Sequence, residues 1–319
     1  MIKKFSLLLL AAGLCYSAAL AQAKPGSAFQ IVPLGIKGGI DESSLSAYMI
    51  APAGTHNYIC MDAGTLCAGI QRAVAKGTFK VPAEQVLRQY IKGYCISHSH
   101  LDHLSGLIIN SPADSNKNIY AFANCINTFK THYFTNTSWS NFANEGEAPQ
   151  LKKYTYQTLE PARMISLPGT DMQLTAYPLS HSNLTSTAFL LKSKDDYVLY
   201  LGDTGPDEVE KSHNLQQLWQ QVAPLVKNKH LKAILIEVSF PDEQPDKSLF
   251  GHLTPRWLMH ELQTLESYAG AGSLKGFNVI ITHVKPPENK ILELKQQLKT
   301  ENILQLNLLF PEQGKAINL

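Results

Sequence analysis

The stretch His98-Ser99-His100-Leu101-Asp102-His103 decides the fold and predicts a metal site. Four of its six residues carry imidazole or carboxylate groups, which zinc, manganese and iron bind in proteins. His98 and His100 are two residues apart, so in an extended segment their side chains point to the same side. Asp102 and His103 follow where a predicted apolar strand gives way to a helix. One short loop can therefore offer ligands to two neighbouring metal ions, and the alternative of a polar surface loop is disfavoured.

Further ligand-type residues lie at the ends of predicted strands, far along the chain from this loop. His181 follows the strand predicted at 172–178, Asp203 follows the strand at 197–201, and His283 follows the strand at 277–282. Strand ends beside tight loops are where α/β folds place active sites. Each residue alone could be structural, but together with the loop they form a coherent ligand set.

The whole chain alternates between predicted strands and helices, which by itself indicates an α/β fold with helices covering sheets. The other strands are predicted at 28–34, 45–50, 58–61, 93–97, 188–192 and 232–238. Helices are predicted at 83–92, where Gly93 would stop the helix, and at 104–109, 215–226, 255–265 and 288–299. The segment 111–159 is rich in Asn, Thr and aromatic residues, and it is predicted to be an irregular insertion with some helix.

The histidine loop resembles the HxHxDH motif of the metallo-β-lactamase superfamily. Asp62 resembles that superfamily's early structural aspartate, and the three distant residues match its later metal motifs. The resemblance implies an αββα sandwich, with two mixed β-sheets flanked by helices, over a single hydrolase domain at 24–319. It also implies that one metal is held by His98, His100 and His181, that a second is held by Asp102, His103 and His283, and that Asp203 bridges both.

A narrower resemblance covers residues 98–112, His-Ser-His-Leu-Asp-His-Leu-Ser-Gly-Leu-Ile-Ile-Asn-Ser-Pro. These residues are similar, position by position, to the pattern of class II cyclic-nucleotide phosphodiesterases. The resemblance implies hydrolysis of 3′,5′-cyclic nucleotides, cAMP or cGMP or both, to nucleoside 5′-monophosphates. It also implies two divalent metal ions, expected to be zinc, which can hold a bridging hydroxide when about 3.5–4 Å apart. Tyr133, Phe134 and Trp139 are candidates for stacking on the nucleobase.

Glu237 and His252 form a second motif, at the end of a buried strand and before a helix. Phosphodiesterase branches of the superfamily carry a similar Glu-then-Gly-His-Ser/Thr pair. By that resemblance His252 is the candidate general acid for the leaving group, Glu237 orients it, and Asp102 helps to orient the hydroxide. The alternative for His252 is a structural ring at the start of a helix.

Two other functions remain open at this point. The first is another hydrolase on the same fold, acting on a different phosphodiester, a sulfate ester, a thioester or a β-lactam; the match over residues 98–112 and the pair Glu237 and His252 disfavour the last two. The second is a metal-binding or ligand-sensing protein that has lost catalysis, which the intact ligand set disfavours. The remaining histidines are predicted to be structural or surface residues: His56, His132, His213, His230 and His260.

The first 23 residues are predicted to be a secretory signal peptide, cleaved after Ala21 or Ala23. Lys3 and Lys4 precede a short apolar run at 7–14, which is too short to span a bilayer comfortably. We therefore expect an exported protein, periplasmic in a Gram-negative source, with no membrane association after cleavage. The signal does not define the oligomeric state.

Net charge and cysteine content limit which partners the protein can bind and whether it can form disulfides. Loss of Lys3 and Lys4 takes the formal charge from +2 to about zero, so no electrostatic footprint for a nucleic acid polymer is expected. A small anionic substrate held by metal fits this balance. Four cysteines remain after cleavage, and an exported protein can pair them or keep them as buried thiols: Cys60, Cys67, Cys95 and Cys125.

Overall fold

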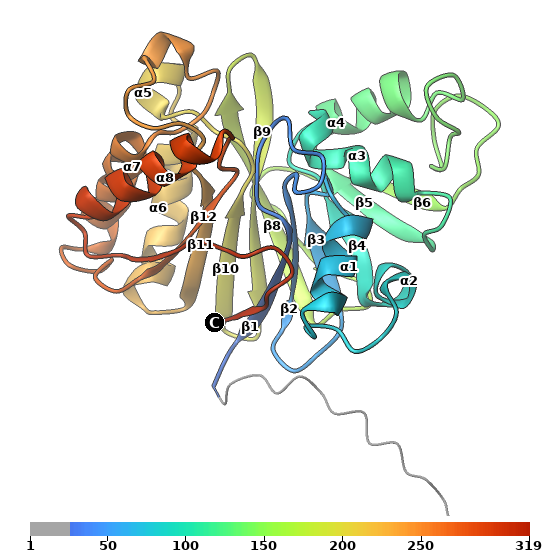
Figure 1. Ribbon diagram of the computed structural model, residues 1–319, viewed down its shortest axis with the longest axis horizontal. Coiled ribbons are helices and arrows are strands. Elements are labelled where there is room, and N and C mark those ends of the chain that lie inside the picture. Colours follow the sequence, from blue (N-terminus) through green and yellow to red (C-terminus); the bar gives the residue numbers. More distant parts are fainter. Residues whose placement is uncertain (1–25) are drawn as a thin grey trace, which may run out of the picture.

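Two seven-stranded β-sheets pack face to face in this computed structural model, which describes residues 26–319 (Figure 1). Helices cover the outer face of each sheet, so the predicted αββα sandwich is confirmed. The predicted signal peptide at 1–23 lies outside the described residues. No helix within 26–319 combines the length and the apolar character needed to cross a membrane.

The first sheet is built mainly from the N-terminal half of the chain. Its order is β14 (Ile317–Asn318), β1 (Phe29–Gly35), β2 (Ala47–Pro52), β3 (Tyr58–Met61), β4 (Ile91–Cys95), β5 (Lys117–Ala121) and β6 (Tyr154–Thr158). Its helical cover consists of α1 (Cys67–Ala75), α2 (Ala83–Gln85), the π-helical turn η1 (Val86–Tyr90), α3 (Leu101–Asn110), α4 (Ala123–Thr128) and the π-helical turn η2 (Phe129–Tyr133).

The second sheet is built from the C-terminal half. Its order is β13 (Asn307–Leu309), β12 (Asn278–Thr282), β11 (Leu231–Glu237), β10 (Asp196–Leu201), β9 (Leu184–Ser193), β8 (Met172–His181) and β7 (Met164–Leu167). The helical segments of this half are α5 (Asp207–Glu210), α6 (Asn214–Lys227), the 3₁₀ turn η3 (Asp246–Ser248), α7 (Pro255–Ala269) and α8 (Glu288–Thr300). Helices α6, α7 and α8 pack their buried faces on this sheet.

Side chains from both sheets meet in a shared inner core. Ile31 and Tyr48 of the first sheet join Phe189, Val198 and Leu235 of the second in one fully buried cluster. Burying each such side chain contributes about 1.5–3 kcal/mol to folding. This core fixes the two sheets against each other, and so it fixes the relative position of loops that come from opposite halves of the chain.

The prediction of an irregular insertion with some helix at 111–159 was wrong where β5 and β6 lie, whereas α4, η2 and the irregular stretch 134–153 agree with it. This segment contributes β5 and β6, which pair in parallel next to β4. Polar residues hid the strands, because Lys117 at the start of β5 is buried and ion-paired with Asp114. A buried charge with a partner does not follow the apolar pattern by which strands are recognised.

The helix predicted at 83–92 is also shorter than expected. It ends at Tyr90, and Gly93 lies inside β4, where it pairs with Ile59 and Asn118, instead of ending the helix. A Cβ atom at position 93 would come within 3.2 Å of the Asn118 carbonyl oxygen, so pairing on both sides of β4 favours glycine there.

The carboxyl ends of five strands gather at one edge of the sandwich. In the second sheet β10, β11 and β12 are parallel, and β8 runs with them because β8 and β10 are both antiparallel to β9. The end of β4 in the first sheet leads into the loop 96–100 and then α3. The ligand-type residues predicted from the sequence follow or end these strands.

Candidate dimetal active site

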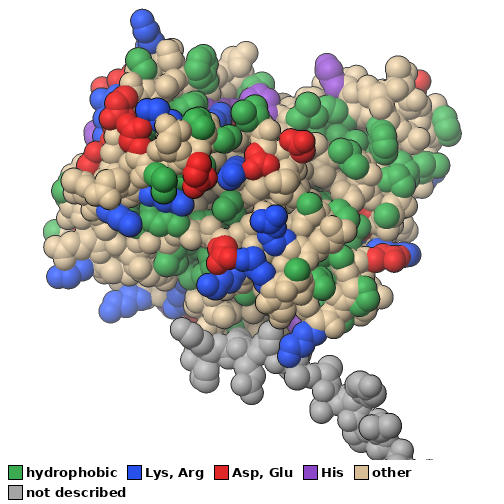
Figure 2. All heavy atoms as spheres, viewed as in Figure 1, with side chains coloured by type: hydrophobic (Ala, Val, Ile, Leu, Met, Phe, Trp, Pro, Cys, Tyr) green, Lys and Arg blue, Asp and Glu red, His purple; other side chains and the backbone are tan. Residues whose placement is uncertain are grey.

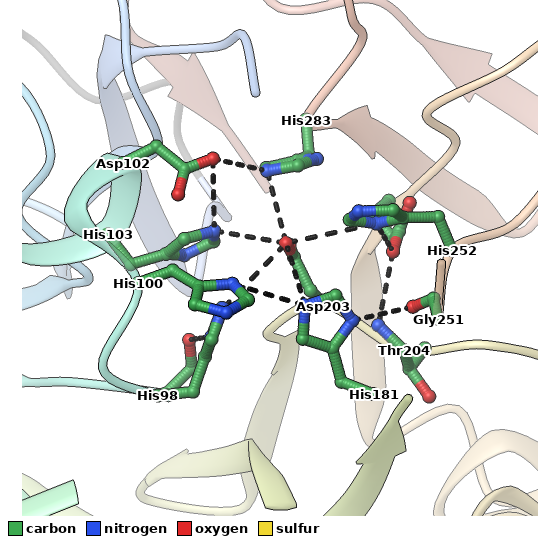
Figure 3. A network of polar contacts seen from close by, with 12 residues as sticks. His98, His100, Asp102, His103, His181, Asp203, Thr204, Gly251, His252 and His283 are labelled. Atoms are coloured by element: carbon green, nitrogen blue, oxygen red, sulfur yellow. Dashed lines mark hydrogen bonds and ion pairs between the residues drawn. The ribbon is translucent and has the colours of Figure 1, made fainter. Parts of the chain in front are cut away.

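All seven predicted metal ligands come together at this edge (Figure 3). Ligand atoms of His98, His100 and His181 lie within 4.8 Å of one another. A second group lies within the same limit and consists of Asp102, His103, Asp203 and His283. The structure therefore places the two sets that the resemblance implies side by side.

Asp203 lies between the two sets. Its Oδ2 atom is 3.2 Å from His103 Nε2 and 3.1 Å from His283 Nε2. The same oxygen is 3.9 Å from Nε2 of both His98 and His181. Burial alone would raise the pKa of Asp203, but the neighbouring His103 and His283 rings hold it well below its ordinary value. One ionised carboxylate is thus within reach of both sets.

The chemistry of the donor atoms fits bound cations. His98 Nε2 is buried without a hydrogen-bond partner, while its Nδ1 lies 3.0 Å from Ser97 Oγ. His181 Nε2 and His100 Nδ1 are 3.3 Å apart. Ligands at 2.0–2.1 Å in a tetrahedral arrangement are separated by about 3.4 Å, so this spacing suits a shared metal ion. The buried His and Asp cluster therefore fits a dimetal site.

Burial keeps the histidines of the first set ready to bind metal. It lowers the pKa of His98 well below its ordinary value and lowers the pKa of His181 to about 4. The His181 Nδ1–H donates to the Gly251 carbonyl oxygen at 2.8 Å, which leaves the Nε2 lone pair facing the cluster. A neutral ring with a fixed tautomer is the form in which histidine ligates a metal.

His103 behaves differently because it is surrounded by carboxylates. Burial opposes protonation, but the negative charges of Asp203, Asp62 and Asp102 raise the pKa of His103 well above its ordinary value. In the absence of metal, a proton on the His103 ring provides the positive charge that balances the surrounding carboxylates. Metal binding at the second set must therefore displace a proton.

Asp62 holds the loop 96–100 in place through contacts of its carboxylate. Its Oδ1 accepts the Ser97 N–H at 2.7 Å, and its Oδ2 accepts the Tyr200 hydroxyl at 2.6 Å. Oδ2 is also 2.7 Å from His103 Nδ1, so it orients that ring toward Asp203. Tyr200 belongs to β10 of the second sheet, and Asp62 therefore ties the loop of one sheet to the other.

Two glycines allow backbone to approach the site closely. A Cβ atom at Gly38 would lie 2.1 Å from the His283 ring, and one at Gly251 would lie 2.6 Å from His181 Nδ1. Gly251 also has a φ of +78°, a conformation that side-chain-bearing residues rarely adopt. Beside Gly38, the Gly39 N–H donates to Asp102 Oδ2 at 2.8 Å and so fixes that carboxylate.

The predicted pair Glu237 and His252 is also present. His252 Nδ1 lies 2.7 Å from Glu237 Oε1, and Glu237 further accepts the Thr204 N–H at 3.1 Å and the Ser239 hydroxyl at 2.6 Å. Burial lowers the pKa of His252 to about 3 and raises that of Glu237 to about 7. His252 also falls within 4.8 Å of His181 and Asp203, so the geometry leaves a ligand role open for it.

Lys285 is the main site residue that the sequence analysis missed. Its Nζ donates to His252 Nε2 at 2.8 Å. The signal was available, because Lys285 follows His283 by two residues, the spacing that had linked His98 and His100. Ser239 was missed as well; its hydroxyl lies 2.9 Å from His283 Nδ1 and orients that ring.

The three candidates for nucleobase stacking differ in their burial and contacts. Phe134 is fully buried in the core against the first sheet, so the prediction that it stacks on a base was wrong. Tyr133 donates its hydroxyl to the Ser99 carbonyl oxygen at 2.8 Å, beside the metal ligands. Trp139 is partly exposed and donates to Ser111 Oγ.

The remaining histidines and the cysteines lie outside the ligand groups of the described residues. His56, for example, stacks on Tyr90 at 4.5 Å. The four cysteines within residues 26–319 are free: three are buried, and Cys67 is exposed.

Comparisons with known proteins agree on family and fold. Residues 75–314 match the family model described as class-II cAMP phosphodiesterases. A 3′,5′-cyclic-nucleotide phosphodiesterase of Aliivibrio fischeri is 45% identical, covering 95% of this chain and 96% of its own. The crystal structure of unliganded yeast PDE1 is similar with a TM-score of 0.82 and 24% identity, over 92% of this chain and 100% of that one. The metallo-β-lactamase fold protein YhfI of Bacillus subtilis is similar with a TM-score of 0.61 and 16% identity, over 91% and 99%.

Proposed function

The chain belongs to the class II cAMP phosphodiesterase family, and we propose that it hydrolyses 3′,5′-cyclic AMP or GMP to the 5′-monophosphate with two zinc ions. One observation carries this proposal: Asp203 Oδ2 lies 3.1–3.9 Å from nitrogens of both ligand sets. Five imidazoles and two carboxylates without a thiolate suit zinc, although imidazole also suits other metals.

The ligands would be shared as the resemblance implies, with His98, His100 and His181 on one ion and Asp102, His103 and His283 on the other. Bound ions would supply a water of lowered pKa and a positive seat for the phosphate oxygens. The chain itself keeps the ligand rings in place through Asp62, Ser239 and the Gly251 carbonyl. Asp203 contributes the negative charge that both sets share.

The leaving ribose oxygen needs a proton, because an alkoxide is a poor leaving group. His252 is buried beside the cluster, and Glu237 holds its Nδ1–H. Since burial raises the pKa of Glu237 to about 7, the pair as a unit can hold one additional proton near neutral pH. We therefore assign the pair to protonation of the leaving group through His252 Nε2, once this nitrogen carries the proton in place of its hydrogen bond from Lys285, with Glu237 positioning the ring.

Replacement of His252 by alanine tests this assignment. We expect kcat to fall by about 100-fold, the low end for loss of a general acid, while both metals stay bound. Metal content by atomic emission and turnover of cyclic AMP measure the two effects. His260→Ala, on the helix α7 that follows His252 in the chain, is the matched control and should leave both unchanged. Loss of metal in His252→Ala would show that His252 is a ligand instead.

The proposed reaction is tested by incubating the metal-loaded protein from Lys24 onward with 3′,5′-cyclic AMP, beside Asp102→Ala. We expect 5′-AMP from the parent and none above background from the variant, because Asp102 belongs to the second ligand set. Chromatography of the products separates 5′-AMP from 3′-AMP. No product from protein shown to hold two metals would point to another ester substrate on the same fold.

Charge favours a small substrate over a nucleic acid polymer. Lys and Arg side chains are interspersed with Asp and Glu on the face shown in Figure 2, and the formal charge after signal cleavage is about zero. A polymer-binding surface would need clustered positive charge. We propose the cyclic nucleotide as the substrate because the bound metals can neutralise its single phosphate.

We also propose that the protein is exported, on the basis of the signal-like residues 1–23. Fractionation of a Gram-negative host that expresses the full chain with a C-terminal tag tests this. Periplasmic protein that begins after Ala21 or Ala23 is expected. Uncleaved protein in the cytoplasmic fraction would contradict export.

A further inference from the structure

Lys285 places an ammonium at the site, and within residues 26–319 it forms no ion pair with a carboxylate. Its ammonium lies 2.8 Å from His252 Nε2 and 5.1 Å from the centre of the Phe240 ring. Neither neighbour supplies a negative charge, since one is an imidazole nitrogen that accepts the hydrogen bond and the other is an apolar ring. Among the residues that the structure describes, no carboxylate lies within the 4.0 Å that defines an ion pair with this ammonium.

The buried Lys117 shows what a structural ammonium requires in this protein. It is ion-paired with Asp114, which also accepts hydrogen bonds from Tyr94 and Tyr154. A charge removed from water is costly unless it is paired. Lys285 is half-buried and lacks such a partner, so its local surroundings suit an anion supplied from outside the chain.

The position of Lys285 relative to the two sets of candidate metal ligands indicates which anion it could bind. The His252 ring that it contacts lies 4.8 Å from the His181 ring of the first set and 5.2 Å from the His283 ring of the second. The ammonium is therefore beside the place where both sets converge. His100 is exposed and Asp102 and Lys285 are half-buried, so an anion that reaches the ligand sets from solvent can also reach Lys285.

We infer that Lys285 binds the phosphate of the cyclic nucleotide and of the 5′-monophosphate product. This inference rests on the proposed function. In-line attack adds negative charge to the phosphoryl oxygens, and a fixed ammonium stabilises that charge more than the charge of the ground state. Lys285 thus contributes to catalysis through charge, and its contact with His252 keeps the ammonium aimed at the site.

The test compares a ligand that has the phosphate with one that lacks it. Calorimetry on metal-loaded protein measures binding of 5′-AMP and of adenosine to the parent, Lys285→Met and Lys285→Arg. We expect the Met variant to bind 5′-AMP about 10–100-fold more weakly, with adenosine affinity and metal content unchanged. Its kcat/KM for cyclic AMP should fall by about 100-fold. The Arg variant keeps the charge and should retain more of both.

Lys290→Met is the matched control, since Lys290 lies on α8 in a surface ion pair with Glu293 and should not affect either ligand. Equal weakening of 5′-AMP and adenosine in Lys285→Met would overturn the inference, and so would unchanged 5′-AMP affinity. A drop in kcat alone would mean that Lys285 only positions His252. Because the binding comparison does not need turnover, a parent that binds 5′-AMP without hydrolysing cyclic AMP would count against the proposed function alone.

Discussion

Replacing Asp203 by asparagine is expected to abolish metal-dependent hydrolysis, with a loss on the order of 10⁴-fold in kcat. The substitution keeps the shape of the side chain and removes the charge that faces four imidazole nitrogens. Without it, two neighbouring cations would lack the one carboxylate that both sets can reach. Metal content should fall from two ions to one or fewer per chain, as measured by atomic emission on protein dialysed against zinc.

Asp196→Asn is the matched control for this experiment. Asp196 begins β10, the strand that leads to Asp203, and forms a half-exposed ion pair with Lys232 at 2.9 Å. Surface pairs contribute about 0–1 kcal/mol, so activity and metal content should stay near those of the parent. An Asp203→Asn protein that keeps two ions and most of its turnover would show that Asp203 does not bridge the sets.

Removing the metals with a chelator is expected to have the second large effect. Turnover should fall to background and return when zinc is restored, because the proposed reaction draws its nucleophile from water on the ions. The melting temperature should also fall, since bound metal stabilises the folded state by mass action. Turnover that persists in protein shown to be free of metal would contradict the dimetal assignment. Restoration by manganese or iron but not by zinc would correct the metal identity alone.

The effect of pH on the metal-free protein follows from the buried histidines. Burial lowers the pKa of His181 to about 4, whereas an unfolded histidine titrates near 6.5. The unfolded chain therefore binds more protons as the pH falls through this window, so the stability that the neutral ring provides above pH 6.5 is lost toward pH 4. His103 opposes this trend because its pKa is raised, but His98, His100 and His252 shift in the same direction as His181.

Urea unfolding at pH 7 and pH 5 measures this difference. We expect a lower free energy of unfolding at pH 5 for the metal-free protein. In the metal-loaded protein the zinc affinity should also fall on acidification, because His103 must release a proton before the second set can bind. Equal midpoints at the two pH values in metal-free protein would contradict a net loss of stability from the buried histidines.

Much of the candidate site could be predicted from the sequence because its ligands follow strand ends. His181, Asp203 and His283 each close or follow a strand whose apolar residues mark it clearly. Parallel strands bring such ends to one edge, so residues a hundred positions apart converge. The fold followed from the same loop, since the HxHxDH resemblance selected two sheets where periodicity alone allowed only helices covering sheets.

What escaped prediction depended on pairing across the fold. Strands β5 and β6 were hidden because Lys117 is buried with Asp114, a contact that no periodic pattern contains. Phe134 was a candidate for stacking on the nucleobase and is instead fully buried in the core. Burial of a particular side chain is set by which elements pack over it, and local composition does not encode that.

By itself the sequence determined which residue types could bind metal, the strand ends that carry them and the family of the chain. Only the tertiary structure decided that one oxygen of Asp203 faces both ligand sets, that Asp62 ties the loop to Tyr200 of the other sheet, and that Lys285 lies against His252. The physical reason is that these interactions depend on the distances between atoms that are far apart in the sequence. Coulombic and hydrogen-bonding energies depend on separations of a few ångströms, and those separations arise only when the shared core fixes the two sheets against each other.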